Sequence, residues 1–286
     1  MNAPVAPFRL KWAGGKRWLA DALITSLGRD VFKSGLCEPF AGGAALSFAI
    51  KGASPLHLSD TNRDLIETYR AIKEIPEALA SELAALAVDP GVFERVRAEA
   101  PLTTLQRAVR TIYLNRTAFN GLWRVNALGQ FNVPYGCKPE TRLPSRDELI
   151  ATSAILEKAR LEERDFETAA SSTSATTVYF DPPYTVSHNN NGFIRYNERI
   201  FSWTDQQRLA ATAGHLTGRG HVVIVSNAFH QDVRKLYRDG PFKLYRVSRV
   251  TNLAANAEHR GAVSELLVIS RNVRLRSLPS FAVRID

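Results

Sequence analysis

Short apolar runs alternate with amphipathic stretches along much of the chain. Six runs are expected to form strands, at 36–40, 56–60, 178–181, 222–226, 245–250 and 265–269. Helical patterns separate several of them, at 16–26, 44–50, 62–72 and 204–216. Thr204 and Gln207 match a capping box at the start of the last helix. The alternation predicts an α/β fold with a mostly parallel twisted sheet and helices on both faces.

The pattern changes after residue 75, where helices are expected at 76–86 and 105–116 with no strong strand between them. We therefore expect a helical insertion at residues 62–150. The core would then consist of residues 1–61 and 151–286. A hydrophobic content of 45% supports a full-sized core in a chain of 286 residues.

The insertion is expected to carry a β-hairpin and an excess of positive charge. The runs 122–125 and 130–133 flank a polar turn that ends in Gly129. Residues 101–146 carry seven basic side chains and one acidic one, and residues 219–286 carry twelve and five. Two separate basic segments suggest two walls of a cleft that binds a polyanion, the alternative being a generally basic surface.

Two cysteines, Cys37 and Cys137, are too few for a disulfide framework or a zinc site, which fits a reducing cytoplasm. The chain has no run of about 18 apolar residues that could span a membrane. Residues 1–9 lack the apolar core of a signal peptide. We therefore expect a cytoplasmic protein with no membrane span and no metal centre.

The most informative motif is Asp181-Pro182-Pro183-Tyr184, which follows an apolar run expected to be a buried strand. Each proline fixes its φ and lacks an N–H, so the turn is stiff and presents a carboxylate, a carbonyl and an aromatic ring together. Two acceptors suit an exocyclic amino group, and the ring suits stacking on an extruded adenine or cytosine. The alternative is a strand end followed by an ordinary proline turn.

A second group of residues suits a nucleoside cofactor. Residues 38–43 follow the first expected strand and end in paired glycines, which let the backbone approach a ligand. The second strand ends in Asp60, where a carboxylate suits a ribose diol. The GxGxxG pyrophosphate signature is missing here, so S-adenosylmethionine fits better than a dinucleotide. An ordinary tight turn at the glycines and a helix cap at Asp60 remain alternatives.

The segment 11–16, upstream of the first helix, places glycines beside an aromatic ring and two lysines. It suggests a lid in which Trp12 packs on the cofactor and Lys16 pairs with a carboxylate. A plain loop before a helix is the alternative.

Together these motifs resemble the Dam family of DNA adenine N6-methyltransferases. The matching blocks occur in the family's order: LKWAGGK at 10–16, EPFAGG at 38–43, LSDTNRDLI at 58–66, LNRTAFNGLWRVNALGQFNVPYG at 114–136, DPPY at 181–184, VSN at 225–227 and RGAVSELLV at 260–268. The resemblance implies a Rossmann-like methyltransferase core and a DNA-recognition insertion. It also implies methyl transfer from S-adenosylmethionine to N6 of a flipped adenine in a short duplex site, with GATC as the first guess.

The resemblance also implies roles for individual residues. Those that line the cofactor are Trp12, Lys16, Asp60 and Asp181, with Phe40, Asp165 and Phe166 around its adenine. Those that contact DNA are Lys11, Phe119, Asn120, Leu122, Arg124 and Pro134. We expect Arg124 at the hairpin tip, where its fork matches O6 and N7 of guanine, with a phosphate contact as the alternative.

The expected catalytic residues are Asp181, Pro182 and Tyr184. The Asp181 carboxylate and the Pro182 carbonyl would accept hydrogen bonds from the amino group of the flipped base, and Tyr184 would stack on it. Neither cysteine lies in a motif for attack on a cytosine ring, so direct transfer to the amino nitrogen is expected, driven by positioning and electrostatics.

Two positions depart from the family pattern. Some members carry tyrosine where this chain has Phe119, which keeps a wedge for the base stack and loses a hydroxyl. The segment 185–202 differs from the form typical of GATC-specific members. Its polar run at 189–192 suits a loop that orders on DNA, or a plain solvated loop.

Two other functions remain as alternatives. Cytosine N4 methylation would also use an exocyclic amine, and a DNA-binding regulator would keep the fold without catalysis. The retained DPPY motif, Asp60 and Lys16 argue against the regulator. The expected partner is double-stranded DNA, with no obligate protein partner, a monomer in solution and association with the nucleoid.

Overall fold

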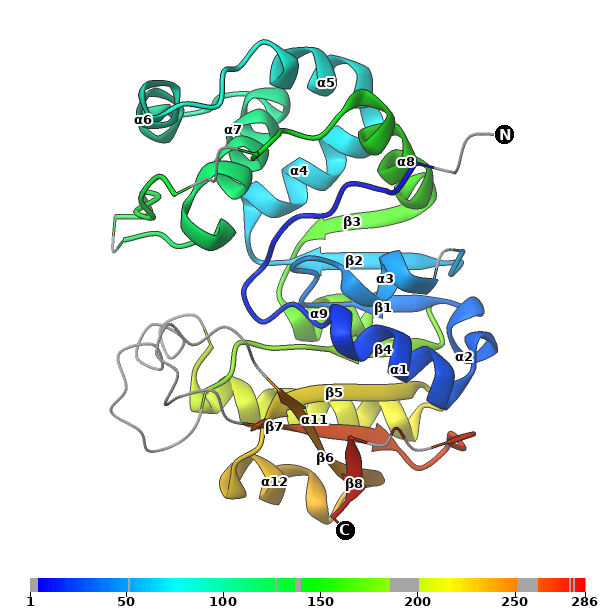
Figure 1. Cartoon of the computed structure of the whole chain (residues 1–286). Coiled ribbons are helices and arrows are strands. Elements are labelled where there is room, and N and C mark those ends of the chain that lie inside the picture. Colours follow the sequence, from blue (N-terminus) through cyan, green and yellow to red (C-terminus); the bar gives the residue numbers. More distant parts are fainter. Residues whose placement is uncertain are drawn as a thin grey trace.

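The computed structural model describes residues 5–50, 52–126, 128–136, 140–185, 201–250, 262–277, 279 and 281–285. Within them one sheet has the strand order β3-β2-β1-β4-β5-β7-β6-β8 (Figure 1). Its strands are β1 (Leu36–Glu38), β2 (Leu56–Asp60), β3 (Ala159–Glu163), β4 (Thr177–Phe180), β5 (Val222–Ala228), β6 (Phe242–Val250), β7 (Ala262–Ser270) and β8 (Ala282–Arg284).

Strands β1 to β5 are parallel, and β7, β6 and β8 follow as antiparallel neighbours. The chain order reverses between β1 and β4, which makes the carboxyl ends of these strands the expected ligand site. The prediction of an α/β fold with a mostly parallel sheet is confirmed. The sequence missed β3 because its residues, Ala-Arg-Leu-Glu-Glu, form a charged edge strand whose side chains are only partly buried.

Helices cover both faces of the sheet (Figure 1). The helices are α1 (Arg17–Leu27), α2 (Arg29–Lys33), α3 (Ala45–Ile50), α4 (Arg63–Glu74), α5 (Pro76–Ala84), α6 (Pro90–Ala98), α7 (Thr104–Thr117), α8 (Arg146–Leu156), α9 (Phe166–Ser171), α11 (Trp203–Gly218) and α12 (Gln231–Arg238), with a 3₁₀ turn η1 (Phe119–Gly121). The predicted capping box at Thr204 is wrong. Ser202 caps α11 and Asp205 returns the bond, because the helix begins at Trp203.

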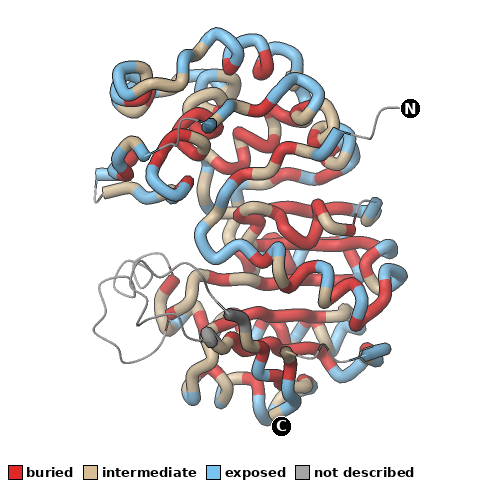
Figure 2. The backbone as a smooth tube through the Cα atoms, viewed as in Figure 1, coloured by how far each residue is buried: buried red, intermediate tan, exposed pale blue. Residues whose placement is uncertain are grey.

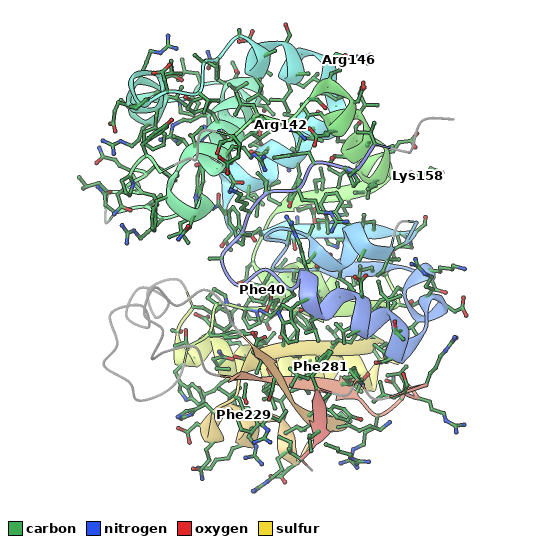
Figure 3. All side chains as sticks on the ribbon, viewed as in Figure 1. Phe40, Arg142, Arg146, Lys158, Phe229 and Phe281 are labelled. Atoms are coloured by element: carbon green, nitrogen blue, oxygen red, sulfur yellow. The ribbon has the colours of Figure 1, made fainter. Side chains whose placement is uncertain are left out.

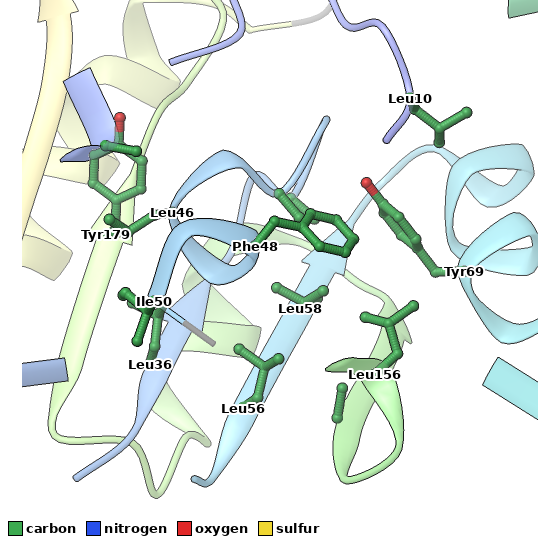
Figure 4. Close-up of a cluster of buried hydrophobic side chains, with 14 of the residues drawn as sticks. Leu10, Leu36, Leu46, Phe48, Ile50, Leu56, Leu58, Tyr69, Leu156 and Tyr179 are labelled. Atoms are coloured by element: carbon green, nitrogen blue, oxygen red, sulfur yellow. The ribbon is translucent and has the colours of Figure 1, made fainter. Parts of the chain in front are cut away.

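Two apolar cores lie on opposite faces of the sheet. Along β4, Tyr179 belongs to the core on one face, and Val178 and Phe180 belong to the core on the other, as the two-residue period of a strand requires. Figure 4 shows part of the first core, where Phe48 of α3 and Tyr69 of α4 lie over β2. Buried residues run continuously through the sheet in Figure 2, so the edge that carries the site rests on a rigid support.

The helices α4 to α8 lie beside β3, at the top of Figure 1. Helix α4 links them to the sheet, since it packs on β2 and β3 as well as on α7 and α8. A separate apolar cluster joins α6 and α7 to the hairpin and contains Phe93, Tyr113 and Phe131. The expected end of the insertion at residue 150 falls inside α8.

The hairpin spans 118–135 and is held by two isolated bridges, Ala118 with Tyr135 and Val125 with Phe131. On either side of the Val125–Phe131 bridge, the Asn126 N–H donates to the Gln130 carbonyl at 2.8 Å and the Asn132 N–H donates to the Arg124 carbonyl at 3.1 Å. The predicted hairpin is therefore present, but as short bridges and not as two regular strands.

Candidate active site

The carboxyl ends of the parallel strands bring acidic side chains to one edge of the sheet. Strands β1 and β2 end in Glu38 and Asp60, and Asp181 directly follows β4. In open α/β sheets ligands bind at this edge. The antiparallel β7 adds Glu265 there, opposite Ala228 at the end of β5.

Asp181 is held by two donors from different parts of the chain. The Lys16 ammonium lies 3.0 Å from Asp181 Oδ1, and the Ser226 hydroxyl donates to the same oxygen at 2.7 Å. The Tyr179 hydroxyl lies 3.0 Å from the Ser226 hydroxyl oxygen. Because both donors bind Oδ1, the carboxylate is fixed in orientation, and among the described residues no hydrogen bond occupies Oδ2.

Tyr184 is fixed by a hydrogen bond at its hydroxyl and by a cation at its ring. Its hydroxyl donates to Glu265 Oε2 at 2.7 Å, and Lys16 Nζ lies 4.7 Å from the ring centre. An ammonium at that distance is attracted by the negative face of the ring. Pro182, which directly follows Asp181 in the chain, is buried. The structure thus brings the predicted residues Lys16, Asp181, Pro182 and Tyr184 together.

Burial sets the protonation of these groups. Burial raises the pKa of Asp181, and the nearby Lys16 ammonium and Ser226 hydroxyl oppose that rise by favouring the carboxylate. Burial, reinforced by the carboxylates of Asp181 and Glu265, raises the pKa of Tyr184 well above its ordinary value. Tyr184 therefore remains a neutral phenol that donates its proton.

Glu38 is a further buried acid at this edge. Burial raises its pKa to about 7, although the Ser47 backbone N–H and hydroxyl both donate to its Oε1. Both donors belong to Ser47 of α3, the helix that follows residues 38–43. Glu38 therefore ties the end of β1 to α3 and so holds the turn with the paired glycines in place.

Asp60 is held by backbone donors on both sides. The Gly42 N–H donates to Oδ2 at 3.1 Å and the Asn62 N–H donates to Oδ1 at 2.9 Å. Burial raises the pKa of Asp60. Asn62, and not Asp60, is the N-cap of α4. Since a carboxylate has about four acceptor sites, Asp60 can still accept hydrogen bonds from a diol.

Trp12 lies directly over the turn that carries Gly42. A Cβ at Gly42, whose φ is +44°, would stand 2.8 Å from Trp12 Cδ1, so only glycine permits this approach. The Tyr69 hydroxyl donates to the Gly42 carbonyl at 2.7 Å and fixes the turn from the other side. The predicted residues Trp12 and Asp60 therefore meet at one glycine.

Phe40, Phe166 and Asp165 are the residues that were expected around the adenine of the cofactor. The Phe40 and Phe166 rings stack with centres 5.2 Å apart, so no base lies between them in this arrangement. Phe166 is buried, and Phe40, labelled near the middle of the molecule in Figure 3, is partly exposed. Asp165 caps α9, and its carboxylate pairs with Arg208 at 3.0 Å. A base would therefore meet the outer face of Phe40.

The residues expected to contact DNA lie on two segments that touch, with Lys11 on the N-terminal segment and the others on the hairpin region at 119–134. Phe119 and Leu122 are exposed apolar side chains, at 51% and 40%. Asn120 has a φ of +54°, a conformation that asparagine tolerates better than most residues. The Pro134 carbonyl accepts from the Phe119 N–H at 2.9 Å, which ties the two sides of the hairpin together.

The sequence suggested that Arg124 lies at the hairpin tip, and the structure shows that it does not. It precedes the Val125–Phe131 bridge, and its Nε donates to the Asn132 side-chain oxygen at 2.8 Å. This bond holds an exposed guanidinium in one direction, which suits a planar contact. The prediction for residues 189–192 concerns a segment outside the described residues.

Asn115 and Trp123 join the N-terminal segment to α7 and the hairpin, and no local pattern in the sequence predicts either contact. The buried Asn115 amide accepts from the Lys11 N–H at 2.9 Å and donates to the Lys11 carbonyl at 2.6 Å. Trp123 of the hairpin stacks on Trp12 with ring centres 6.3 Å apart and an angle of 18°. The N-terminal segment that covers the Gly42 turn and the hairpin are therefore in direct contact.

Ser226 and Glu265 are further site residues that the sequence did not identify individually, although both belong to motif blocks. A glutamate inside the apolar run Ala262–Ser270 was the one available signal, because a charge seldom lies buried in a strand without a partner. The strand also begins three residues earlier than expected, which places Glu265 within it and not at its start.

Among the described residues, no group of three or more His, Cys, Asp and Glu side chains could hold a metal ion. No helix in the described part of the chain is long and apolar enough to cross a membrane. Cys37 is a buried free thiol, and burial raises its pKa to about 12, so it is not a nucleophile. Cys137 lies outside the described residues.

The sheet order and the DPPY edge are those of a Rossmann-like methyltransferase. A family model described as D12 class N6 adenine-specific DNA methyltransferase matches residues 12–253, and the chain belongs to this family. The protein is thus an adenine-specific DNA methyltransferase, in agreement with the prediction from the sequence motifs.

Named relatives align along nearly their whole length. The chain is 31% identical over 269 residues to the Type II methyltransferase M1.LlaDCHI of Lactococcus lactis subsp. cremoris, which covers 90% of this chain and 93% of that protein. It is 30% identical over 288 residues to the Type II methyltransferase M.MjaIII of Methanocaldococcus jannaschii, covering 93% and 99%. It is 31% identical over 271 residues to the DNA adenine methylase of Serratia marcescens, covering 92% and 97%.

Proposed function

We propose that this enzyme transfers a methyl group from S-adenosylmethionine to N6 of an adenine flipped out of a short duplex DNA site. The observation that carries the proposal is the cluster of Lys16, Asp181 and Tyr184, in which a carboxylate oxygen and an aromatic ring lie side by side. Asp60 lies at the same edge, at the end of β2, with β1 between it and β4, which Asp181 follows.

The residues present fit S-adenosylmethionine. Asp60 retains acceptor capacity for a ribose diol, the Gly42 backbone allows close approach, and the outer face of Phe40 suits adenine. Lys16 already contacts the Gly14 carbonyl at 2.7 Å and Asp181 at 3.0 Å, with Glu265 further away at 3.7 Å. A cofactor carboxylate at Lys16 would therefore compete with Glu265 more readily than with Asp181. When bound, the cofactor supplies an electrophilic methyl group.

The protein's own groups prepare the amino nitrogen. Its lone pair is delocalised into the base, so the nitrogen is a poor nucleophile until its hydrogens are drawn out of the ring plane. Asp181 Oδ2 and the Pro182 carbonyl would accept those hydrogens, and Tyr184 would stack on the base. Lys16 and Ser226 favour the ionised form of Asp181 and fix its orientation, so catalysis would come from preorganised electrostatics and positioning.

Replacing Asp60 with alanine is expected to weaken S-adenosylmethionine binding by about 1.5–3 kcal/mol, because a charge-assisted hydrogen bond is lost. Trp12→Ala is expected to weaken it too, since the Trp12 indole covers the Gly42 turn. Calorimetry on the two variants measures both effects, with the exposed Asp147→Ala as control. Unchanged affinity in both variants would show that the cofactor binds elsewhere.

We propose that the enzyme acts as a monomer and that its insertion reads the DNA. We also propose that the insertion extends to the end of α8, because α8 packs on α4 and α5. Its exposed Phe119 and Leu122 suit a wedge against the base stack, and its excess of positive charge suits the phosphate backbone. The N-terminal segment touches the insertion through Asn115 and the Trp12–Trp123 stack, so DNA held by the hairpin lies next to the DPPY edge.

Arg124→Ala is expected to relax the preference at one guanine by about 1–3 kcal/mol, because a bidentate arginine–guanine contact is lost. Methylation of a mixed-sequence DNA library, followed by mapping of the modified sites, measures this effect. We propose GATC as the first site to examine in the wild-type data.

Arg146→Ala is the matched control, because Arg146 is an exposed arginine on α8, labelled at the upper right of Figure 3. It should leave site preference unchanged. If Arg124→Ala lowers methylation equally at all sequences, Arg124 contacts phosphate and the bases are read elsewhere.

A further inference from the structure

Glu265 is a buried acid whose position depends on the antiparallel strand β7. It lies opposite Ala228 of β5 and Val247 of β6 and is 3% exposed. Its neighbours along the strand, Leu266 and Leu267, are apolar and buried. Burying a carboxylate in such a strand costs several kcal/mol, and an apolar residue would fill the same place at less cost.

The carboxylate makes two contacts with the DPPY edge through a single oxygen. Glu265 Oε2 accepts from the Tyr184 hydroxyl at 2.7 Å and lies 3.7 Å from Lys16 Nζ. The same ammonium lies 3.0 Å from Asp181 and 4.7 Å from the Tyr184 ring centre. One lysine therefore lies among two carboxylates and an aromatic ring.

This arrangement locks the ring that would stack on the base. A tyrosine side chain can change its χ1 and χ2 torsion angles, and a hydrogen bond at its hydroxyl restricts both changes. Glu265 provides that anchor from β7, an inner strand of the sheet. Misplacement of a stacking group by about 1 Å can cost about 100-fold in rate.

On the basis of the proposed function, we propose that Glu265 is a positioning residue for methyl transfer: its carboxylate fixes the Tyr184 hydroxyl so that the ring and Asp181 are held in one geometry. Glu265 touches neither the base nor the methyl donor in this role. It acts through Tyr184, and Lys16 links the same oxygen to Asp181.

A double-mutant cycle on Tyr184→Phe and Glu265→Leu tests the role. Each single variant removes the same hydrogen bond and is expected to lower kcat about 10-fold with KM for DNA nearly unchanged. The double variant should be no slower than either single variant, because the bond can be lost only once. Glu265→Gln retains an acceptor oxygen and should recover most of kcat.

Equilibrium fluorescence of duplex DNA with 2-aminopurine at the target base gives a readout besides turnover. Loss of the anchored ring should change the emission of the bound base equally in Tyr184→Phe and Glu265→Leu, while DNA affinity is retained. Glu163→Gln, at the exposed end of β3, is the matched control and should change neither quantity. If Glu265→Leu does not fold, Glu265→Met, which is closer in shape to glutamate and also lacks an acceptor, replaces it in the cycle and in the emission measurement.

Multiplicative losses in the double variant, or wild-type emission and kcat in Glu265→Leu, would overturn the inference. A fall in kcat for Glu265→Leu that Tyr184→Phe does not share would also overturn it. These outcomes are distinct from failure of the proposed function, in which the wild-type enzyme itself would not methylate adenine in DNA.

Discussion

Asp181→Ala is expected to lower kcat for DNA methylation by at least about 100-fold, because it removes a preorganised acceptor at the reacting nitrogen. The fold should survive, since Lys16 keeps the Gly14 carbonyl at 2.7 Å and Glu265 at 3.7 Å as partners. Single-turnover transfer from labelled S-adenosylmethionine measures the rate, and a thermal melt checks the fold.

The control for this variant is Asp239→Ala, at an exposed position beyond α12. It should retain full activity. Near-wild-type transfer by Asp181→Ala would show that the DPPY edge does not hold the amino group.

Lys16→Met is expected to lower the free energy of unfolding by about 3 kcal/mol, because removing one member of a buried ion pair leaves its partner uncompensated. Lys16 is 4% exposed, and its loss leaves the Asp181 carboxylate with one donor, Ser226. The variant should also lose methyl transfer, since Asp181 is no longer held in its ionised form.

The destabilisation of Lys16→Met should grow with pH. Burial already raises the pKa of Asp181, and without the ammonium that pKa rises further. An acid with a raised pKa binds more protons in the folded than in the unfolded state, so stability falls as pH increases. Denaturant unfolding at pH 5 and pH 8 measures this.

Lys33→Met is the matched control, because Lys33 pairs with Asp30 at 3.6 Å on the surface and such pairs contribute less than about 1 kcal/mol. Equal losses in Lys16→Met and Lys33→Met, or a larger loss for Lys16→Met at pH 5, would contradict the role assigned to the buried cluster.

The sequence predicted those parts of the fold that depend on local periodicity. The runs that form β1, β2, β4 and β5 are rich in apolar residues because parallel strands are buried on both faces. The ends of such strands meet at one edge, so Asp60 and Asp181 could be placed there from the sequence. Strand β3 escaped prediction because it is a charged edge strand.

The contacts of the site are harder to predict, because they join segments far apart in the chain. Lys16 was expected to pair with a carboxylate, and the structure shows that its nearest partner is Asp181, which the sequence alone did not identify. The Glu265–Tyr184 bond depends on β7 lying between β5 and β6, an order that no periodicity reveals. The Trp12–Trp123 stack likewise requires the N-terminal segment to lie beside the hairpin.

The central claim is methyl transfer to adenine N6 at the DPPY edge, and the most direct test is the identity of the modified nucleoside. Duplex DNA treated with the enzyme and S-adenosylmethionine is digested to nucleosides and separated by chromatography with mass detection. We expect N6-methyladenine with the wild type and almost none with Asp181→Ala. N4-methylcytosine as the product, or equal amounts of N6-methyladenine from both proteins, would contradict the account.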